Sequence, residues 1–215
     1  MSKKFIAAAL ATAALATVPF AAQAQAEGPF MVRVRAVRLD SANDNNAQLT
    51  TTLAGLGAGE AYINNKWLPE LDISYFFTPN IAAELILTYP QKQDLSLGGV
   101  GKIGTFKHLP PTLSLQYHFA PGTSFRPYVG LGVNYTNISS VHWESAVSAL
   151  KLNLDRNSFG LSAQIGADIE ISKNLYLNVD IKKVQIGTTV SSNGADIGKF
   201  KVDPVLLGVG LGMRF

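Results

Sequence analysis

The sequence contains no cysteine among its 215 residues. This absence excludes a disulfide framework, a thiol nucleophile and a zinc site built on cysteine. Charged residues are scarce as well, at 15% of the chain, whereas an average soluble domain carries about 25%. Long apolar runs are also missing after residue 26, because no stretch there reaches the roughly 18 apolar residues of a membrane-spanning helix.

What the sequence does contain is apolar character without apolar runs. Hydrophobic residues make up 47% of the chain, and the mean hydropathy is +0.15. The 19 glycines and seven tyrosines form no low-complexity tract, which argues against disorder. A transmembrane β-barrel has this kind of composition, because lipid-facing residues alternate with inward-facing residues along each strand.

The first 26 residues have the pattern of a bacterial secretory signal peptide. Lys3 and Lys4 precede an Ala/Leu-rich run, and two small-x-small sites predict cleavage after Ala24 or Ala26. Removing two of the 18 basic residues leaves a net charge of about +1 against 15 acidic residues. This balance lacks the basic excess of a nucleic-acid-binding protein. We expect residues 27–215 to form the mature barrel.

Eight segments of the mature chain alternate between apolar and polar side chains with the period of two that is typical of a half-buried strand. Several reach the roughly 9–11 residues that a tilted strand needs to cross a membrane. The pattern predicts an all-β fold, an eight-stranded antiparallel transmembrane barrel. The predicted strands are residues 30–37, 70–77, 81–89, 111–119, 125–135, 158–171, 175–186 and 205–215.

The connections between these segments alternate in length. Three are tight turns of turn-forming residues, and four are long and polar, at residues 38–65, 90–107, 136–157 and 187–201. Outer-membrane barrels combine short periplasmic turns with long extracellular loops. We therefore expect a monomer surrounded by outer-membrane lipid of a Gram-negative bacterium, with both termini in the periplasm.

The predicted inward face carries acids and bases together. The interior of an eight-stranded barrel is only wide enough to be filled by side chains. We therefore expect opposite charges to pair and plug the periplasmic half of the lumen. These charges are Arg33, Arg35, Glu70, Asp72, Glu84, Arg126, Asp168, Glu170, Asp180, Lys182 and Arg214.

A few apolar residues interrupt this polar inward face. Phe76, Ile86 and Val184 stand at inward positions, and Trp67 and Leu109 stand with Leu68 at the outer ends of strands. Together they predict a pocket, open to the outside, that would hold a small hydrophobic molecule or a detergent. A dry packing layer inside the barrel is an equally good interpretation of the same residues.

Pro110 and Pro111 stand where the fourth predicted strand begins. Proline has no N–H, so two adjacent prolines remove two ladder donors and are tolerated only at an edge, an end or a bulge. They predict a local opening of the wall, a lateral gap toward lipid. A simple strand start fits the sequence equally well.

Two stretches, His108–Leu113 with the sequence HLPPTL and Phe125–Thr136 with the sequence FRPYVGLGVNYT, resemble the signature stretches of the OmpW family. Residues 80–85, 203–204 and 212–215 fit as well, so the resemblance covers essentially the whole mature chain. It implies an eight-stranded outer-membrane barrel with a narrow hydrophobic channel that is open outside and closed toward the periplasm. It also implies passive uptake of small hydrophobic molecules, with lateral release through the wall into the membrane.

The resemblance further implies that Ile86 and Phe159 form the floor of this channel. Alternation agrees for Ile86 but places Phe159 on the lipid face, so either a bulge at residues 158–160 turns it inward or half of the floor is missing. The terminal Phe215 resembles the C-terminal signal that outer-membrane assembly machinery reads.

Two other functions compete with uptake. One is a structural or surface-interaction barrel whose extracellular loops act as adhesin or receptor. The other is an enzyme, for which His142, Glu144 and Ser145 share one loop, but no nucleophile elbow is present, and we expect no catalysis. The three histidines lack ligand spacing, so we expect no metal and no cofactor. Residues around 144–150 fit a short helix.

Overall fold

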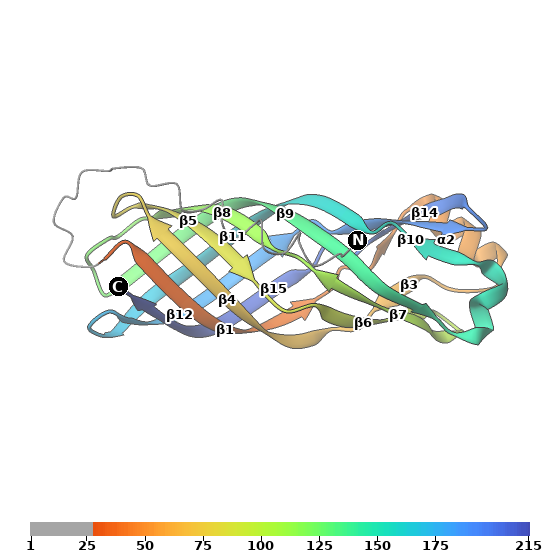
Figure 1. Ribbon diagram of the computed structural model, residues 1–215, viewed down its shortest axis with the longest axis horizontal. Coiled ribbons are helices and arrows are strands. Elements are labelled where there is room, and N and C mark those ends of the chain that lie inside the picture. Colours follow the sequence, from red (N-terminus) through yellow and green to blue (C-terminus); the bar gives the residue numbers. More distant parts are fainter. Residues whose placement is uncertain (1–27) are drawn as a thin grey trace, which may run out of the picture.

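The computed structural model describes residues 28–215, so the predicted signal peptide, residues 1–26, lies outside the described residues. Eight strands close into one antiparallel barrel, which confirms the predicted fold class (Figure 1). They are β1 (Phe30–Asp40), β4 (Lys66–Phe76), β5 (Ile81–Leu87), β8 (Thr112–His118), β9 (Phe125–Trp143), β11 (Asn157–Ser172), β12 (Leu175–Val184) and β15 (Val205–Arg214).

The barrel closes because the first strand pairs with the last. On one edge β1 pairs with β15, from Met31 opposite Arg214 to Asp40 opposite Val205, and on its other edge it pairs with β4. The remaining neighbours follow in the order β4, β5, β8, β9, β11, β12 and β15. Closure gives each of the eight barrel strands a neighbour on both sides, as strands in lipid require.

Alternation along each strand places charged side chains inside and apolar ones outside. On β1, Arg33 and Arg35 are buried while Val34 between them is exposed. Leu131 on β9 and Leu161 on β11 are 72% and 62% exposed. Such residues form the apolar outer band of a membrane barrel. Within residues 28–215, no helix is long and apolar enough to cross a membrane.

One end of the barrel holds the short turns and the chain ends. The N–H of Phe215 donates a hydrogen bond to the carbonyl of Phe30 at 2.9 Å, so the two ends of the described chain are adjacent. The turns that follow β4, β8 and β11 lie at the same end, on the left of Figure 1. This end of the barrel corresponds to the predicted periplasmic side.

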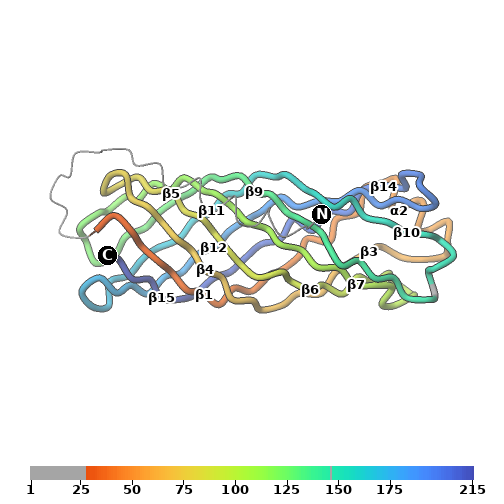
Figure 2. The backbone as a smooth tube through the Cα atoms, in the orientation of Figure 1, coloured from red at the N-terminus to blue at the C-terminus, as the bar shows by residue number. Residues whose placement is uncertain are grey.

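At the opposite end, the four long connections continue well beyond the membrane-spanning strands (Figure 2). They fold into regular structure: β9 runs on to Trp143 rather than ending near Tyr135, and β7 pairs with it. A second, four-stranded sheet has the order β10-β13-β14-β2. The additional elements are β2 (Asp44–Asn45), α2 (Ala47–Gly55), β3 (Ala61–Ile63), β6 (Gln91–Leu97), β7 (Gly101–Leu109), η2 (Ser145–Leu150), β10 (Leu152–Leu154), β13 (Gly187–Ser192) and β14 (Ala195–Lys201).

Two short helices close this outer end. The η2 turn confirms the short helix expected near residues 144–150. The helix α2 was not predicted; it begins at Asn46, whose side chain accepts a hydrogen bond from the N–H of Leu49 at 3.0 Å, as an N-cap does. Leu49 and Leu53, one helical turn apart, are its buried residues.

Candidate functional site

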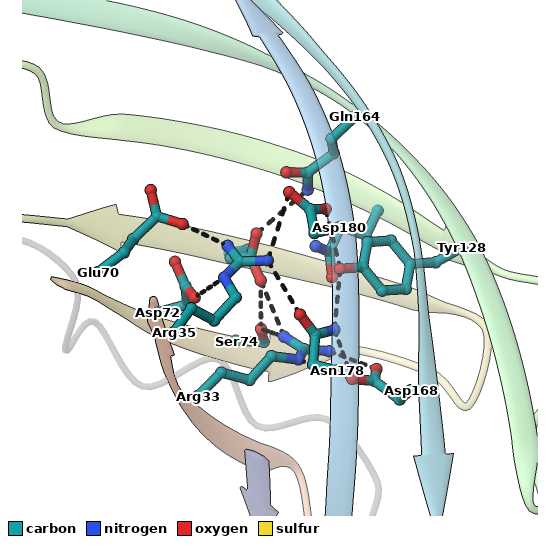
Figure 3. A network of polar contacts seen from close by, with 12 residues as sticks. Arg33, Arg35, Glu70, Asp72, Ser74, Tyr128, Gln164, Asp168, Asn178 and Asp180 are labelled. Carbon is teal, nitrogen blue, oxygen red and sulfur yellow. Dashed lines mark hydrogen bonds and ion pairs between the residues drawn. The ribbon is translucent and has the colours of Figure 1, made fainter. Parts of the chain in front are cut away.

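A charge network centred on two arginines of β1 fills the periplasmic half of the lumen (Figure 3). Here, 'below' means toward the periplasmic end and 'above' means toward the outer end. The guanidinium of Arg33 binds both carboxylate oxygens of Asp168 at 2.9 and 2.6 Å, and it also contacts Glu84 at 2.8 Å. Its Nη1 donates to the hydroxyl of Ser74 at 2.7 Å. Bidentate, charge-assisted pairing of this kind fixes the side chain strongly.

Arg35 makes the second set of ion pairs, one step farther out along β1. It contacts Asp72 at 2.6 Å, Glu70 at 2.8 Å and Asp180 at 3.4 Å. Lys182 also reaches Glu70, at 3.3 Å. The partners of the two arginines come from β4, β5, β11 and β12, so the network crosses the lumen from wall to wall.

A third layer lies between this network and the periplasmic end. Arg214 stacks over the ring of Phe76 at 3.9 Å, and Arg126 stacks over Tyr176 at 4.9 Å and contacts Glu170 at 3.5 Å. Phe76 belongs to an apolar cluster with Met31, Ala82 and Tyr176. Phe76 points into the barrel, as predicted. It lies on the periplasmic side of the charge network, however, and does not line an outer pocket.

Directly above the charge network lies a small apolar pocket of about 30 Å³. Ile86 and Val184 both line it, as the sequence predicts for a pocket or a packing layer, and so does Pro110. Its apolar lining is completed by Leu39, Leu68, Ile186, Pro204 and Leu206, and its polar lining includes Glu70, Gln91, His108 and Lys182. The space holds about one water molecule, so it is a constriction rather than a binding chamber.

Three of the residues predicted to line the pocket have their side chains on the outer face of the barrel. Phe159 is 81% exposed and packs on the ring of Tyr135, and the pairing of β11 with β9 runs without a bulge through residues 157–169. Phe159 therefore does not form the channel floor that the family resemblance implies. It faces outward, as the alternation of the strand predicts. Trp67 is 60% exposed, and Leu109 follows the inward-facing His108, so both belong to the outer face.

An apolar cavity lies farther out, between the four long connections, and has a volume of about 320 Å³. The sequence does not predict this cavity, because the contributing segments are far apart in the chain and their composition predicts polar loops. The visible signals were the i, i+4 pair Leu49 and Leu53 and the alternation of Leu95 and Leu97. Its apolar lining includes Leu49, Leu53, Leu56, Leu95, Leu97, Ile103, Phe106, Trp143, Val147, Leu150, Leu152, Leu154, Val190, Ile197 and Phe200.

The cavity and the constriction share one apolar cluster. Phe106 and Phe200, which line the cavity, pack in the same cluster of buried residues as Val184 and Ile186, which line the constriction. Apolar packing therefore extends from the outer end down to Ile86, together with the buried polar side chains of Gln91, Gln93 and His108, and the charge network begins below it.

The barrel wall is interrupted beside the constriction. Pairing of β5 with β8 ends at Ile86 opposite Thr112, and pairing of β6 with β7 begins only at Gln91 opposite His108. Residues 87–90 and 109–111 between these points share no ladder pairing. The carbonyls of Pro110 and Pro111 accept hydrogen bonds from the Asn134 amide of β9 at 3.2 and 3.1 Å, and that of Pro110 also accepts one from the Thr112 hydroxyl at 3.3 Å.

Two of the three histidines are buried in the barrel and contact glutamine side chains. His108 contacts the amide of Gln93 at 3.1 Å, and His118 contacts that of Gln116 at 3.2 Å. Over residues 28–215, no group of three or more His, Cys, Asp or Glu side chains is arranged to hold a metal ion.

Comparison with known proteins identifies the family. The sequence model of the OmpW family matches residues 26–215. Outer membrane protein W of Vibrio cholerae is 35% identical over 197 residues, covering 86% of this chain and 85% of its own length. The uncharacterized outer-membrane protein y4mB of Sinorhizobium fredii is 36% identical over 194 residues, covering 87% of this chain and 80% of its own.

The crystal structure of the outer membrane protein OprG from Pseudomonas aeruginosa has the same fold. It matches with a TM-score of 0.72 and 28% identity, over 88% of this chain and 97% of that one. These relatives are outer-membrane proteins of Gram-negative bacteria, so the barrel lies in the outer membrane with its termini on the periplasmic side. The chain belongs to the OmpW family of outer-membrane proteins.

Proposed function

We propose that this barrel is a passive channel for small hydrophobic molecules, which enter from outside and leave sideways into the membrane. The observation that carries the proposal is the apolar cavity of about 320 Å³ at the outer end. Its size falls in the range of small-molecule sites, about 300–1,000 Å³. A water-filled porin would have no use for such a lining.

The proposed path runs from the cavity to the constriction at Ile86 and Val184. A solute must displace these side chains, because the constriction measures only about 30 Å³. Below it, Arg35 and its carboxylate partners fill the lumen. An apolar solute cannot replace those ion pairs, since buried charges left without partners are costly. The interruption at residues 87–90 and 109–111 is therefore the outlet that we propose, and Pro110 lies at its inner side.

Uptake by cells tests this function. Cells that carry the barrel in the outer membrane are expected to take up an apolar fluorescent probe about tenfold faster than cells without it, because the lipopolysaccharide leaflet slows apolar solutes. Equal initial rates at equal amounts of folded protein would contradict the proposal. Loss of function after loop exchange, with no effect of cavity substitutions, would favour the surface-interaction barrel instead.

The proposed outlet predicts a separate effect. The double substitution Pro110→Thr and Pro111→Thr restores two N–H donors and two strand-forming residues, so the wall is expected to pair across the interruption. Probe uptake should fall about fivefold, while probe binding in the outer cavity, followed by the fluorescence of its lining residue Trp143, should not change. Pro127→Thr, in the intact β9–β11 wall, is the matched control. Undiminished uptake by the double variant would place the outlet elsewhere.

A further inference from the structure

The outer face of the β6–β7 hairpin carries two lysines directly opposite each other. Lys92 on β6 pairs in register with Lys107 on β7, and both side chains are exposed. Like charges in directly opposed positions of an antiparallel pair are destabilising. In the part of the chain that the structure describes, neither ammonium group has a carboxylate within ion-pair distance.

Asp94, whose charge acts on Lys92, already has a closer partner. Asp94 binds Lys102 at 2.8 Å. The hydrogen bond from Lys102 lowers the pKa of Asp94, with smaller contributions from the charges of Lys92 and Lys66. Glu144 also acts on Lys102. The two acids thus act mainly on Lys102, and among residues 28–215 no carboxylate lies within ion-pair distance of Lys92 or Lys107.

The lysine pair borders a shallow hollow of about 150 Å³ that is lined by hydrogen-bonding groups. Thr105, Ser140 and His142 supply the rest of its lining. The ammonium of Lys66 donates to the backbone carbonyl of Lys92, which adds a further positive charge at the edge. A hollow with two ammonium groups, hydroxyls and an imidazole is suited to a doubly charged anion with several acceptor oxygens.

The height of this hollow along the barrel indicates where such an anion comes from. Leu109 pairs with Asn137, two residues beyond the exposed ring of Tyr135, and Lys107 lies two residues farther out. Each two-residue step rises about 6.7 Å along a strand. Tyr135 and Tyr89 mark the interfacial aromatic level. Two such steps cover about 13 Å along strands that tilt by roughly 40°, so the lysines lie roughly 10 Å above it along the barrel axis, at the level of lipid headgroups.

We propose that the hollow formed by Lys92, Lys107 and His142 binds the phosphate groups of a glycolipid in the outer leaflet of the outer membrane. A phosphate between the two ammonium groups converts their repulsion into two attractive contacts. The hollow follows directly after the wall interruption on the same two chain segments, so the bound lipid flanks residues 87–90 and 109–111. The site is independent of what passes through the channel.

Native mass spectrometry of the full-length mature protein in detergent tests the site. Diphosphorylated lipid A is the probe, and the same lipid without its phosphates is the comparison. We expect the wild type to retain the diphosphorylated form, and the double variant Lys92→Ala, Lys107→Ala to bind it at least tenfold more weakly. Raised salt should weaken the wild-type complex, because the contacts are exposed ion pairs.

The control is Lys199→Ala with Lys201→Ala, a pair of lysines in the same outer region where Lys201 has Asp44 as a partner at 3.5 Å. This variant should bind lipid A as the wild type does. Equal loss in both double variants, or equal retention of the dephosphorylated lipid, would overturn the proposal. Displacement of lipid A by an equal concentration of inorganic phosphate would also overturn it. Without lipid, the Lys92/Lys107 variant should unfold at no lower temperature than the wild type, because a repulsion has been removed.

Discussion

Replacing Ile86 with tryptophan is expected to reduce probe uptake to the rate of cells that lack the barrel. Ile86 is buried at the constriction, where the free volume is about 30 Å³. An indole exceeds that space, and it cannot move toward the periplasm because the ion pairs of Arg35 fill the lumen there. The effect on uptake should therefore be at least tenfold, whereas the outer cavity should still bind the probe.

The matched control for this experiment is Leu85→Trp, on the same strand and the opposite face. An indole there meets lipid, so uptake should stay at the wild-type rate. Overpacking at Ile86 costs about 1–3 kcal/mol of stability, so the folded fraction has to be measured by the heat-dependent shift in electrophoretic mobility. Val184→Phe narrows the same constriction with a smaller increase in volume. Full uptake by folded Ile86→Trp and Val184→Phe would show that solutes do not pass this point.

Replacing Arg33 with methionine is expected to lower the free energy of unfolding by about 3–5 kcal/mol. The substitution leaves the carboxylates of Glu84 and Asp168 buried without the cation that holds them at 2.8 and 2.6 Å. The loss reflects these uncompensated charges rather than the net contribution of the ion pairs. Urea unfolding in lipid vesicles, followed by tryptophan fluorescence, measures it.

Arg38, an exposed arginine of the same strand, serves as the control. Arg38 pairs with Asp40 at 3.1 Å, but both side chains are exposed. Arg38→Met should therefore change the stability by less than about 1 kcal/mol. Adding Glu84→Gln and Asp168→Asn to Arg33→Met should recover part of the loss, because the orphaned charges are removed. A decrease below about 1 kcal/mol for Arg33→Met alone would show that water reaches this network.

Alternation predicted the strands and the face of nearly every residue, because in a membrane barrel the two faces meet lipid and a packed lumen. It does not give the height of a residue along the barrel. Phe76 is therefore correctly inward, yet it packs under Arg214, far from the constriction. Trp67 was assigned to the pocket as an apolar residue at a strand end, although its parity with Leu71 already indicated the outer face. For Phe159, alternation was a better guide than the family position.

The outer cavity was beyond sequence reasoning for a different reason. Its wall is assembled from α2, β6, β7, η2, β10, β13 and β14, and each contributes only a few apolar residues. None of these segments alone shows a long enough periodic pattern to be recognised as a strand or helix. Their apolar character becomes meaningful only when the barrel brings all four connections to one end. Likewise, the opposition of Lys92 and Lys107 depends on a register that the sequence does not show.

The arginine network also constrains how the barrel can be made. Arg33 lies in the first strand, and its partner Asp168 lies 135 residues later, in a strand that is synthesised near the end of the chain. Until the late strands arrive, Arg33 lacks Asp168 and Arg35 lacks Asp180, and each has only its carboxylate partners from β4 and β5. A partly inserted sheet would hold this network incomplete at membrane depth, where charges that lack part of their pairing are costly. The network is complete only when β11 and β12 have joined the barrel, so the last lumen charges pair in the same step that closes the wall.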